Sequence, residues 1–176
     1  VTADIEGNIV SYTLTIESTG GSGTGVPGYG CILNNELTDF DTSVPHPNAP
    51  EPGKRPRSSM SPTIAVAPDG RMLAFGSPGG STIITTVVGI ATNLIDFEMP
   101  LPEAISTPRL SQRNGQTTSL ERTLEGTDMV NDLIALGHQF RPTNEIGAAT
   151  GLEILSKGMI QAAAEPKRRG GGAAMV

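Results

Sequence analysis

The sequence predicts an α+β fold, in which β-hairpins and separate α-helices share one core. Two stretches, 63–75 and 152–163, each join two apolar runs through a turn signal, as β-hairpins do. Two others, 83–95 and 127–136, carry apolar residues at helical spacing. Between the first hairpin and the first helix lies a glycine corner, defined as Gly76–Ser81. The prediction is therefore a strand, a glycine turn and a buried helix in succession.

The glycine corner is the part of the chain that most strongly indicates chemistry. Pro78 restricts the turn, and Gly79 and Gly80 allow backbone conformations that other residues avoid. Ser81 is expected to cap the following helix. Backbone N–H groups at such a corner can hold an anion, or the oxyanion of an acyl-transfer intermediate. Taken alone, such a corner is more often an ordinary tight turn.

Composition limits the classes of function. The 176 residues suit one domain. The content of 36% hydrophobic and 3% aromatic residues, with no Trp, provides few side chains for a hydrophobic core. We therefore expect the chain to be part of a larger folded assembly. A net charge of -6 argues against a nucleic-acid partner. The single cysteine, Cys31, excludes an internal disulfide and is expected to be a small core residue. We expect no membrane segment, no metal site and no cofactor, because no membrane-length apolar run, ligand spacing or nucleotide-binding motif is present.

The N-terminal third is predicted to be strand and loop. Residues 9–17 alternate, with Val10 to Ile16 giving an apolar face and Ser11, Thr13, Thr15 and Glu17 a polar one. That polar face fits either a solvated edge strand or the floor of an active site. Residues 18–30 are glycine-rich, 31–33 suggest a short buried strand, and 34–39 a polar corner. The proline-rich stretch 41–56 is expected to be an extended loop, exposed or wrapped on a partner.

The later elements have clearer boundaries. The helix over 83–95 is expected to be buried along a broad stripe, and a short helix is expected over 102–106. Thr127 is expected to cap the next helix, which Gly137 ends, and His138 is expected at the surface. The closing hairpin turns at 156–158, and 167–176 is expected to be a loose tail. The stripe on the first helix comprises Ile83, Ile84, Val87, Val88, Ala91, Leu94 and Ile95.

Three blocks, 30–40, 54–63 and 76–90, together resemble the small subunit of the γ-glutamyltranspeptidases. This family consists of N-terminal-nucleophile (Ntn) hydrolases, made as one precursor that cuts itself into two chains. The resemblance extends from Val1 to the 168–171 stretch, with the blocks in the family's order and spacing. It implies a four-layer αββα sandwich, of which this chain, as one domain over 1–176, is the small-subunit half completed by a large subunit from the same precursor.

The resemblance also implies an activity. Members of the family are γ-glutamyl transferases or hydrolases. They form an acyl-enzyme on an N-terminal threonine and pass the γ-glutamyl-like acyl group to water or an amine. Counting back from Gly7 places that threonine about four residues before Val1, and Thr2 is out of register. Two alternatives stay open. One is a diverged substrate, as in cephalosporin-type acylases or carbon–carbon bond hydrolases of antibiotic biosynthesis; the other is an inactive paralogue acting as a binding module. The compartment is also open, periplasmic or extracellular for most relatives and cytoplasmic for a biosynthetic one.

Catalytic positions carry over from the resemblance. Thr15 matches the threonine whose hydroxyl bonds to the nucleophile, and Gly79 and Gly80 match the oxyanion donors. The chemistry agrees, because backbone N–H groups stabilise a developing oxyanion.

Substrate-binding positions carry over in the same way. Glu17 matches a position that contacts the amino-acid end of the substrate. Glu36 and Asp39 match the acidic pair for its α-ammonium, and Ser58 and Ser59 the serine pair for its α-carboxylate. Carboxylates suit a cation and hydroxyls suit a carboxylate. Read without the resemblance, the same residues would be ordinary turn carboxylates and loop hydroxyls.

Two departures from the family pattern bear on the substrate. Arg57 stands where an aliphatic residue is usual, and Gly20 stands where a large apolar residue is usual. Glu17 and the 26–30 stretch lean toward the capsule-depolymerase-like branch. The acyl donor is therefore left open beyond its amino-acid end.

Overall fold

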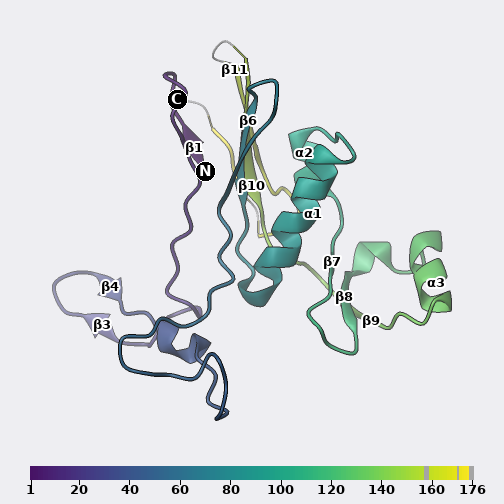
Figure 1. Cartoon of the computed structure of the whole chain (residues 1–176). Helices are drawn as coiled ribbons and strands as arrows, with labels where there is room; N and C mark the ends of the chain where they lie inside the picture. The colour runs from purple at the N-terminus through teal and green to yellow at the C-terminus, as the bar shows by residue number, and fades with distance from the viewer. Residues whose placement is uncertain (157–158, 170, 175–176) are drawn as a thin grey trace. The chain divides into compact units, whose positions relative to one another are not determined.

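The protein, seen in a computed structural model, is described over residues 1–156, 159–169 and 171–174 (Figure 1). The chain divides into two compact units, and the single small-subunit domain over 1–176 stays a prediction. The first unit contains residues 1–13 and 60–176, and the second contains residues 14–59. Among the described residues, no helix combines the length and the hydropathy needed to cross a bilayer.

A four-stranded antiparallel sheet is the centre of the first unit. Its order is β11-β10-β6-β5, with β5 at Thr63–Val66, β6 at Met72–Gly76, β10 at Thr150–Ser156 and β11 at Met159–Ala164. Both predicted hairpins are confirmed by this pairing. The turn expected at Lys157 and Gly158 lies outside the described residues.

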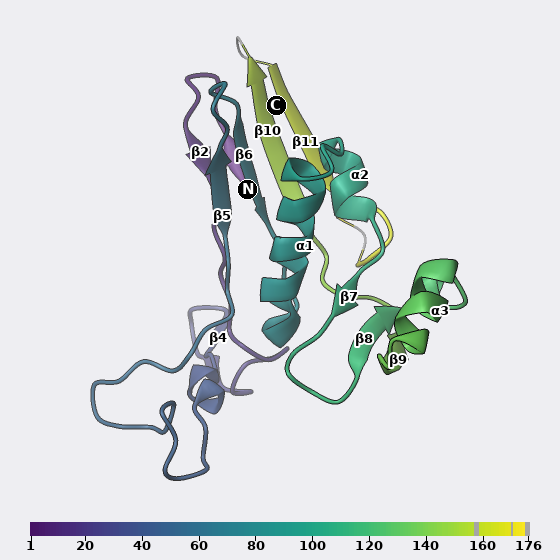
Figure 2. The same cartoon turned by 45° about the vertical axis from the view of Figure 1, so that its right-hand side comes forward.

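Two helices pack on one face of this sheet, as Figures 1 and 2 show. They are α1, Ile83–Ile95, and α2, Leu101–Ser106, which confirm the two predicted helices. Gly151 on β10 permits the close approach of α2, because a Cβ there would lie 2.9 Å from Leu101 Cδ1 and 3.0 Å from Ile105 Cδ1. The core formed between sheet and helices comprises Leu73, Phe75, Ile83, Val87, Ile90, Leu101, Ile105, Ala149 and Ala163.

The buried stripe of α1 is narrower than predicted. Ile84, Val88 and Ile95 are 51%, 59% and 60% exposed, although their spacing placed them in the stripe. The sheet and α2 cover one side of the helix, and these three side chains lie outside that contact. Helical periodicity reports all the apolar residues of a helix, and it does not separate those covered by this chain from those left open.

A second, three-stranded sheet was not predicted. It has the order β7-β8-β9, with β7 at Leu110–Ser111, β8 at Thr118–Glu121 and β9 at Phe140–Thr143. All four residues of β8 are buried although three are polar, so the segment gives no apolar strand signal. β8 and β9 are parallel, and α3, Asp128–Ala135, lies between them in the chain.

The boundaries predicted for α3 are confirmed, but its cap differs. Thr127 occupies the N-cap position and Gly137 follows the helix with φ 95°. The Thr127 hydroxyl donates to the Leu124 carbonyl rather than accepting from the helix N-terminus. A short 3₁₀ turn, η3 at Arg122–Leu124, immediately precedes this point. His138 is exposed, as predicted.

A buried ion network fastens the C-terminal part of the first unit. Arg168 donates to Glu121 and to Glu165, with 2.6 Å between its Nη1 and Glu165 Oε2. Arg109 Nη2 donates to the same Glu165 oxygen at 3.1 Å, and all four side chains are at most 7% exposed. The prediction of a loose tail is therefore wrong at Arg168, because its side chain is buried and bonded to Glu121 and Glu165.

The strand predicted over 9–17 is wrong beyond Val10. Only β1, Thr2–Ala3, and β2, Ile9–Val10, pair here. No other described strand pairs with 11–16, so the alternation there has no ladder to join. In that part Ser11 is half-buried and its hydroxyl donates to the Phe75 carbonyl at 3.3 Å, while Tyr12 is 70% exposed.

The second unit, whose residues are all described, has little core of its own. It contains β3, Gly25–Val26, paired with β4, Cys31–Ile32, and a 3₁₀ helix η1, Glu36–Asp39. Phe40 is its one buried hydrophobic residue. Cys31 is exposed, which contradicts the expectation of a buried strand and a core thiol, because nothing in the unit packs over that hairpin. Residues 41–56 form a loop without helix or strand, as predicted.

Candidate active site

The glycine corner connects the end of β6 to α1 in the first unit. It contains a 3₁₀ turn, η2 at Gly80–Thr82, so α1 begins at Ile83. Gly79 and Gly80 both have positive φ, 147° and 55°. The Thr82 hydroxyl donates to the Gly79 carbonyl at 2.9 Å and fixes the turn. The predicted glycine-dependent turn is therefore present, with its backbone entering a helix N-terminus, where the helix dipole favours negative charge.

Hydrogen bonds of Ser77 and the close approach of Thr82 to Gly79 stabilise this corner. The buried Ser77 hydroxyl donates to the Pro78 carbonyl at 2.7 Å and accepts from the Ala148 N–H at 3.0 Å. A Cβ at Gly79 would lie 2.6 Å from Thr82 Oγ1, so a side chain at this position must displace the turn.

The expected Ser81 cap is wrong. The N-cap of α1 is Thr82, because the 3₁₀ turn occupies the place where the first helical turn was expected. Ser81 is exposed and its hydroxyl accepts a hydrogen bond from Arg113.

Thr15 and Glu17 lie next to each other at the start of the second unit. The Glu17 backbone N–H donates to Thr15 Oγ1 at 2.9 Å. Glu17 has φ 71°, a left-handed conformation that is uncommon for residues other than glycine. Its carboxylate accepts hydrogen bonds from Ser18, Asn35 and Thr38.

These hydrogen bonds favour the ionised form of Glu17. The Ser18 hydroxyl lowers the pKa of the Glu17 carboxyl most, partial desolvation opposes it, and Thr38 and Asn35 lower the pKa further. Asn35 and Thr38 were not expected at the site. Their spacing from Glu17, 18 and 21 residues, carries no local sequence signal that could have found them.

Glu36 and Asp39 are the first and last residues of η1. Residues three apart in a 3₁₀ helix are eclipsed, so both side chains leave the helix on one side. Both residues are half-buried, and neither carboxylate has a hydrogen bond or ion pair with the described residues of the chain. Two half-buried carboxylates that form no ion pair with the described chain suit the binding of a cation.

Ser58 and Ser59 end the second unit. Just before them, the Arg57 N–H donates to Asn48 Oδ1 at 2.9 Å, and Asn48 Nδ2 donates to the Asp39 carbonyl at 2.7 Å. Asn48 therefore ties the start of the serine pair to the end of η1. Ser58 is exposed and Ser59 is half-buried.

The predicted site residues are thus divided between the two units. The second unit holds six of them, and hydrogen bonds through Asn35 and Asn48 connect the segments that carry these six. The first unit holds the two glycines of the corner. The six residues are Thr15, Glu17, Glu36, Asp39, Ser58 and Ser59.

Comparison with known sequences defines the class of protein. A family model described as gamma-glutamyltranspeptidase matches residues 1–175. The chain therefore belongs to the γ-glutamyltranspeptidase family.

Three curated relatives give the degree of similarity. The glutathione hydrolase proenzyme of Bacillus subtilis (strain 168) is 40% identical over 96% of this chain and 29% of its own length. The glutathione hydrolase proenzyme of Escherichia coli (strain K12) is 34% identical over 93% of this chain and 30% of its own length. The acylase ACY 1 proenzyme of Pseudomonas sp. (strain V22) is 38% identical over 78% of this chain and 24% of its own length. The chain thus spans less than a third of each of these three relatives.

Solved structures confirm the α+β fold of the N-terminal-nucleophile class. The γ-glutamyltranspeptidase of Pseudomonas nitroreducens, complexed with L-DON, matches with a TM-score of 0.88 and 31% identity, over 99% of this chain and 97% of that chain. The T380A mutant of Helicobacter pylori γ-glutamyltranspeptidase matches with a TM-score of 0.87 and 36% identity, over 95% of this chain and 97% of that chain. The lean toward the capsule-depolymerase-like branch stays a prediction, based on Glu17 and residues 26–30.

Proposed function

We propose that the protein containing this chain is a γ-glutamyl hydrolase or transferase that works through an acyl-enzyme on an N-terminal threonine. The observation that carries the proposal is the family match over residues 1–175, joined by curated relatives named glutathione hydrolase proenzyme. The nucleophile in this proposal is a threonine about four residues before Val1, exposed when the precursor is cut.

The reaction has two steps in this proposal. The threonine hydroxyl attacks the γ-amide carbonyl, and the N–H groups of Gly79 and Gly80 stabilise the resulting oxyanion. Collapse releases the amine and leaves an ester, which water or a second amine then cleaves. Thr15 holds the threonine by a hydrogen bond. The rigid glycine corner supports this role, because a fixed donor costs no reorganisation when charge develops.

The amino-acid end of the substrate is assigned to the second unit. Glu36 and Asp39 take the α-ammonium, and Ser58 and Ser59 take the α-carboxylate. Support comes from the two half-buried carboxylates of η1, which form no ion pair within the described chain. Glu17 adds a third carboxylate, held in place by Ser18, Asn35 and Thr38.

The chain is proposed to work with a larger chain from the same precursor. Its relatives are proenzymes, and it spans 29% and 30% of two of them. The exposed apolar residues of α1 and of the 10–16 segment support this assembly, because a partner chain can cover large apolar side chains that this chain leaves exposed.

The test compares free and N-acetylated γ-glutamyl anilides on the complete protein and its Asp39→Asn variant. Acetylation removes the positive charge that Asp39 is proposed to bind. The wild type should lose about tenfold to a hundredfold in kcat/KM on acetylation. The variant should be slow with the free substrate and lose little more with the acetylated one. Asp69→Asn, an isosteric change in the exposed β5–β6 turn, is the control and should behave as the wild type.

A diverged acylase is the second candidate. The 38% identity to acylase ACY 1 proenzyme and the presence of Arg57 beside Ser58 favour it. In this candidate the acyl group carries no free α-ammonium. Equal wild-type rates on free and acetylated anilides would therefore contradict the γ-glutamyl assignment and favour the acylase.

A further inference from the structure

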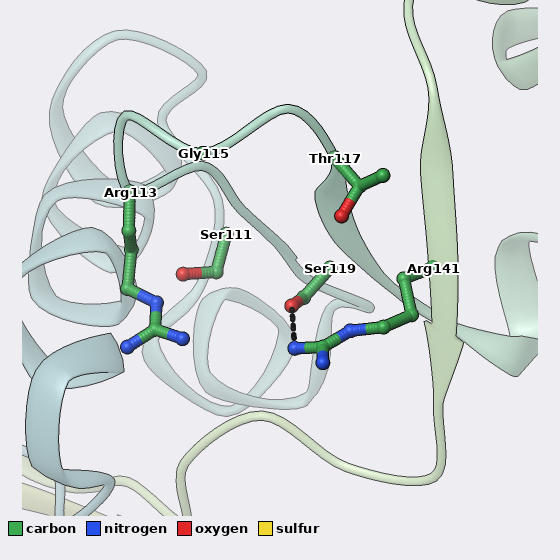
Figure 3. A pocket seen from close by; sticks show the side chains of 6 residues that line it. All are labelled: Ser111, Arg113, Gly115, Thr117, Ser119 and Arg141. Carbon is green, nitrogen blue, oxygen red and sulfur yellow. Dashed lines mark hydrogen bonds between the residues drawn. The ribbon is translucent and has the colours of Figure 1, made fainter.

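We propose that a polar pocket lined by β7, β8, β9 and the β7–β8 loop binds a small multivalent oxyanion such as phosphate. This pocket, here called the arginine pocket, lies in the first unit and has a volume of about 360 Å³. Figure 3 shows the side chains that line it. They are Ser111, Arg113, Gly115, Thr117, Ser119 and Arg141.

Strand register builds the floor of the arginine pocket. Ser111 on β7 pairs with Ser119 on β8, and Ser119 pairs in turn with Arg141 on β9. Residues paired directly across a sheet point to the same face, so these three side chains form one row. Arg141 Nη2 lies 3.4 Å from the Ser119 hydroxyl, the bond drawn in Figure 3. The strand register therefore fixes the positions of two hydroxyls, those of Ser111 and Ser119, and of the Arg141 guanidinium.

The β7–β8 loop brings a second guanidinium to the same space. Arg113 and Arg141 come from different segments and lie on either side of the Ser111 and Ser119 hydroxyls (Figure 3). Ser111 is 2% exposed and its hydroxyl is 2.7 Å from that of Thr85, which fixes it from the α1 side. Thr117 contributes a further hydroxyl to the lining. The pocket thus offers up to two guanidinium forks with hydroxyl groups between them.

The charges around the arginine pocket are unbalanced. Arg71, Arg109, Arg122, Arg168 and Arg169 each form an ion pair with a carboxylate. Among the described arginines of the first unit, only Arg113 and Arg141 form none, and their hydrogen bonds go to the hydroxyls of Ser81 and Ser119. No carboxylate lines the pocket. Two like charges facing one cavity repel, and an anion between them removes that repulsion.

The shape and charge select the chemical class of ligand. Guanidinium forks match the oxygen spacing of phosphate and carboxylate, and two forks can bind more than one oxygen pair at once. A multivalent tetrahedral anion uses both forks and the hydroxyls, whereas a monovalent carboxylate uses one fork. The chain's net charge of -6 disfavours a long polyanion, which leaves a small ion or a small ester as the ligand.

The experiment is titration calorimetry of inorganic phosphate into the complete protein at constant ionic strength. The variants are Arg113→Gln and Arg141→Gln, each of which removes one fork. The matched control is Arg122→Gln, which removes an exposed arginine that is paired with Glu125 outside the pocket. We expect saturable phosphate binding, weakened about tenfold or more by either pocket variant and unchanged by the control. Acetate should bind more weakly than phosphate by a similar factor.

Three results would overturn the proposal. The first is the absence of saturable heat when phosphate is added to the wild type, as expected if another part of the complete protein fills the pocket. The second is equal weakening of phosphate binding by all three variants, which would indicate a general effect of charge. The third is acetate binding as tight as phosphate binding, which would exclude a ligand that uses both guanidinium groups. Circular dichroism of each variant verifies that it is folded, and because both arginines are exposed, neither change removes core packing.

Discussion

The side-chain amide of Asn35 donates a hydrogen bond to the carboxylate of Glu17. The same asparagine accepts the backbone N–H of Ser18 at 3.0 Å, and its own N–H donates to the Ile16 carbonyl. One residue therefore joins the segment carrying Thr15 and Glu17 to the start of the helix carrying Glu36 and Asp39. This junction was not apparent in the sequence, and it makes Asn35 a positioning residue.

Replacing Asn35 should disturb substrate binding more than folding. Asn35→Ala releases the Glu17 carboxylate and the start of η1, so KM for a γ-glutamyl anilide should rise about tenfold. Steady-state kinetics of the complete protein measures this. Asn8→Ala, which removes an exposed asparagine bonded to Asp4, is the control and should leave KM unchanged. The double variant with Glu17→Gln should lose less than the sum of the two single losses; strict additivity would show that the two residues act independently.

The glycine corner should be intolerant at Gly79. Gly79→Ala places a methyl group against the Thr82 hydroxyl and shifts the turn, so turnover should fall on the order of a hundredfold to a thousandfold. Gly70→Ala is the matched control: it also has positive φ, but a Cβ there meets nothing within 4 Å. Both variants carry the backbone strain, and only the first should lose activity. Equal rates for the two would remove the corner from the mechanism.

Arg168 should contribute far more to stability than its neighbour Arg169. Arg168→Ala leaves Glu121 and Glu165 buried with fewer partners, which should lower the free energy of unfolding by about 3–5 kcal/mol. Arg169→Ala removes an exposed pair with Glu145 and should cost about 0–1 kcal/mol. Denaturant titration of the complete protein gives both values. Similar losses for the two variants would contradict the importance assigned to the buried network.

Acid should weaken the same network. Burial raises the pKa of the Glu121 carboxyl, but hydrogen bonds from Arg168 and from the Ile146 and Arg109 N–H groups outweigh it, so the pKa is lowered from 4.5. The stability from a lowered carboxyl pKa is complete above the unfolded value and is lost as pH falls through the folded value. The free energy of unfolding should therefore decline as pH falls below 4.5. Glu121→Gln should flatten this decline, and an unchanged slope would assign it to other carboxylates.

The open face of α1 should matter for assembly. Val88 and Ile84 are exposed one turn apart, and burying each apolar side chain on a partner would contribute about 1.5–3 kcal/mol. Val88→Asp should therefore reduce the amount of larger chain that co-elutes with this one in size-exclusion chromatography. Asn131→Asp, an exposed change on α3, should leave co-elution unchanged. A cooperatively melting monomer of the isolated chain would argue that α1 needs no cover.

Local signals explain which elements could be predicted. The β5–β6 hairpin has its turn residues between two apolar runs, and α1 and α3 have helical spacing, so each element is encoded within a few residues of itself. β8 is different, because its buried Ser119 and Glu121 accept hydrogen bonds from Arg141 and Arg168, 22 and 47 residues along the chain. A buried polar strand looks like a surface loop until those partners are known.

The residues of the candidate site also fall into those that could be located from the sequence and those that could not. The resemblance located Glu36 and Asp39, and the structure places them at the two ends of one 3₁₀ helix. Asn35 and Thr38 were missed, because what distinguishes them is contact with Glu17 across 18 and 21 residues. The alternation over 11–16 predicted a strand, but pairing requires a neighbour that the described chain does not supply.

The ion network joins residues that are synthesised at different times. Arg109 and Glu121 leave the ribosome well before Glu165 and Arg168. During that interval Arg109 lacks its ion pair with Glu165, and Glu121 lacks its ion pair with Arg168. β11, which closes one edge of the four-stranded sheet, emerges in the same late interval. The first unit can therefore complete this network only after Arg168 has been synthesised.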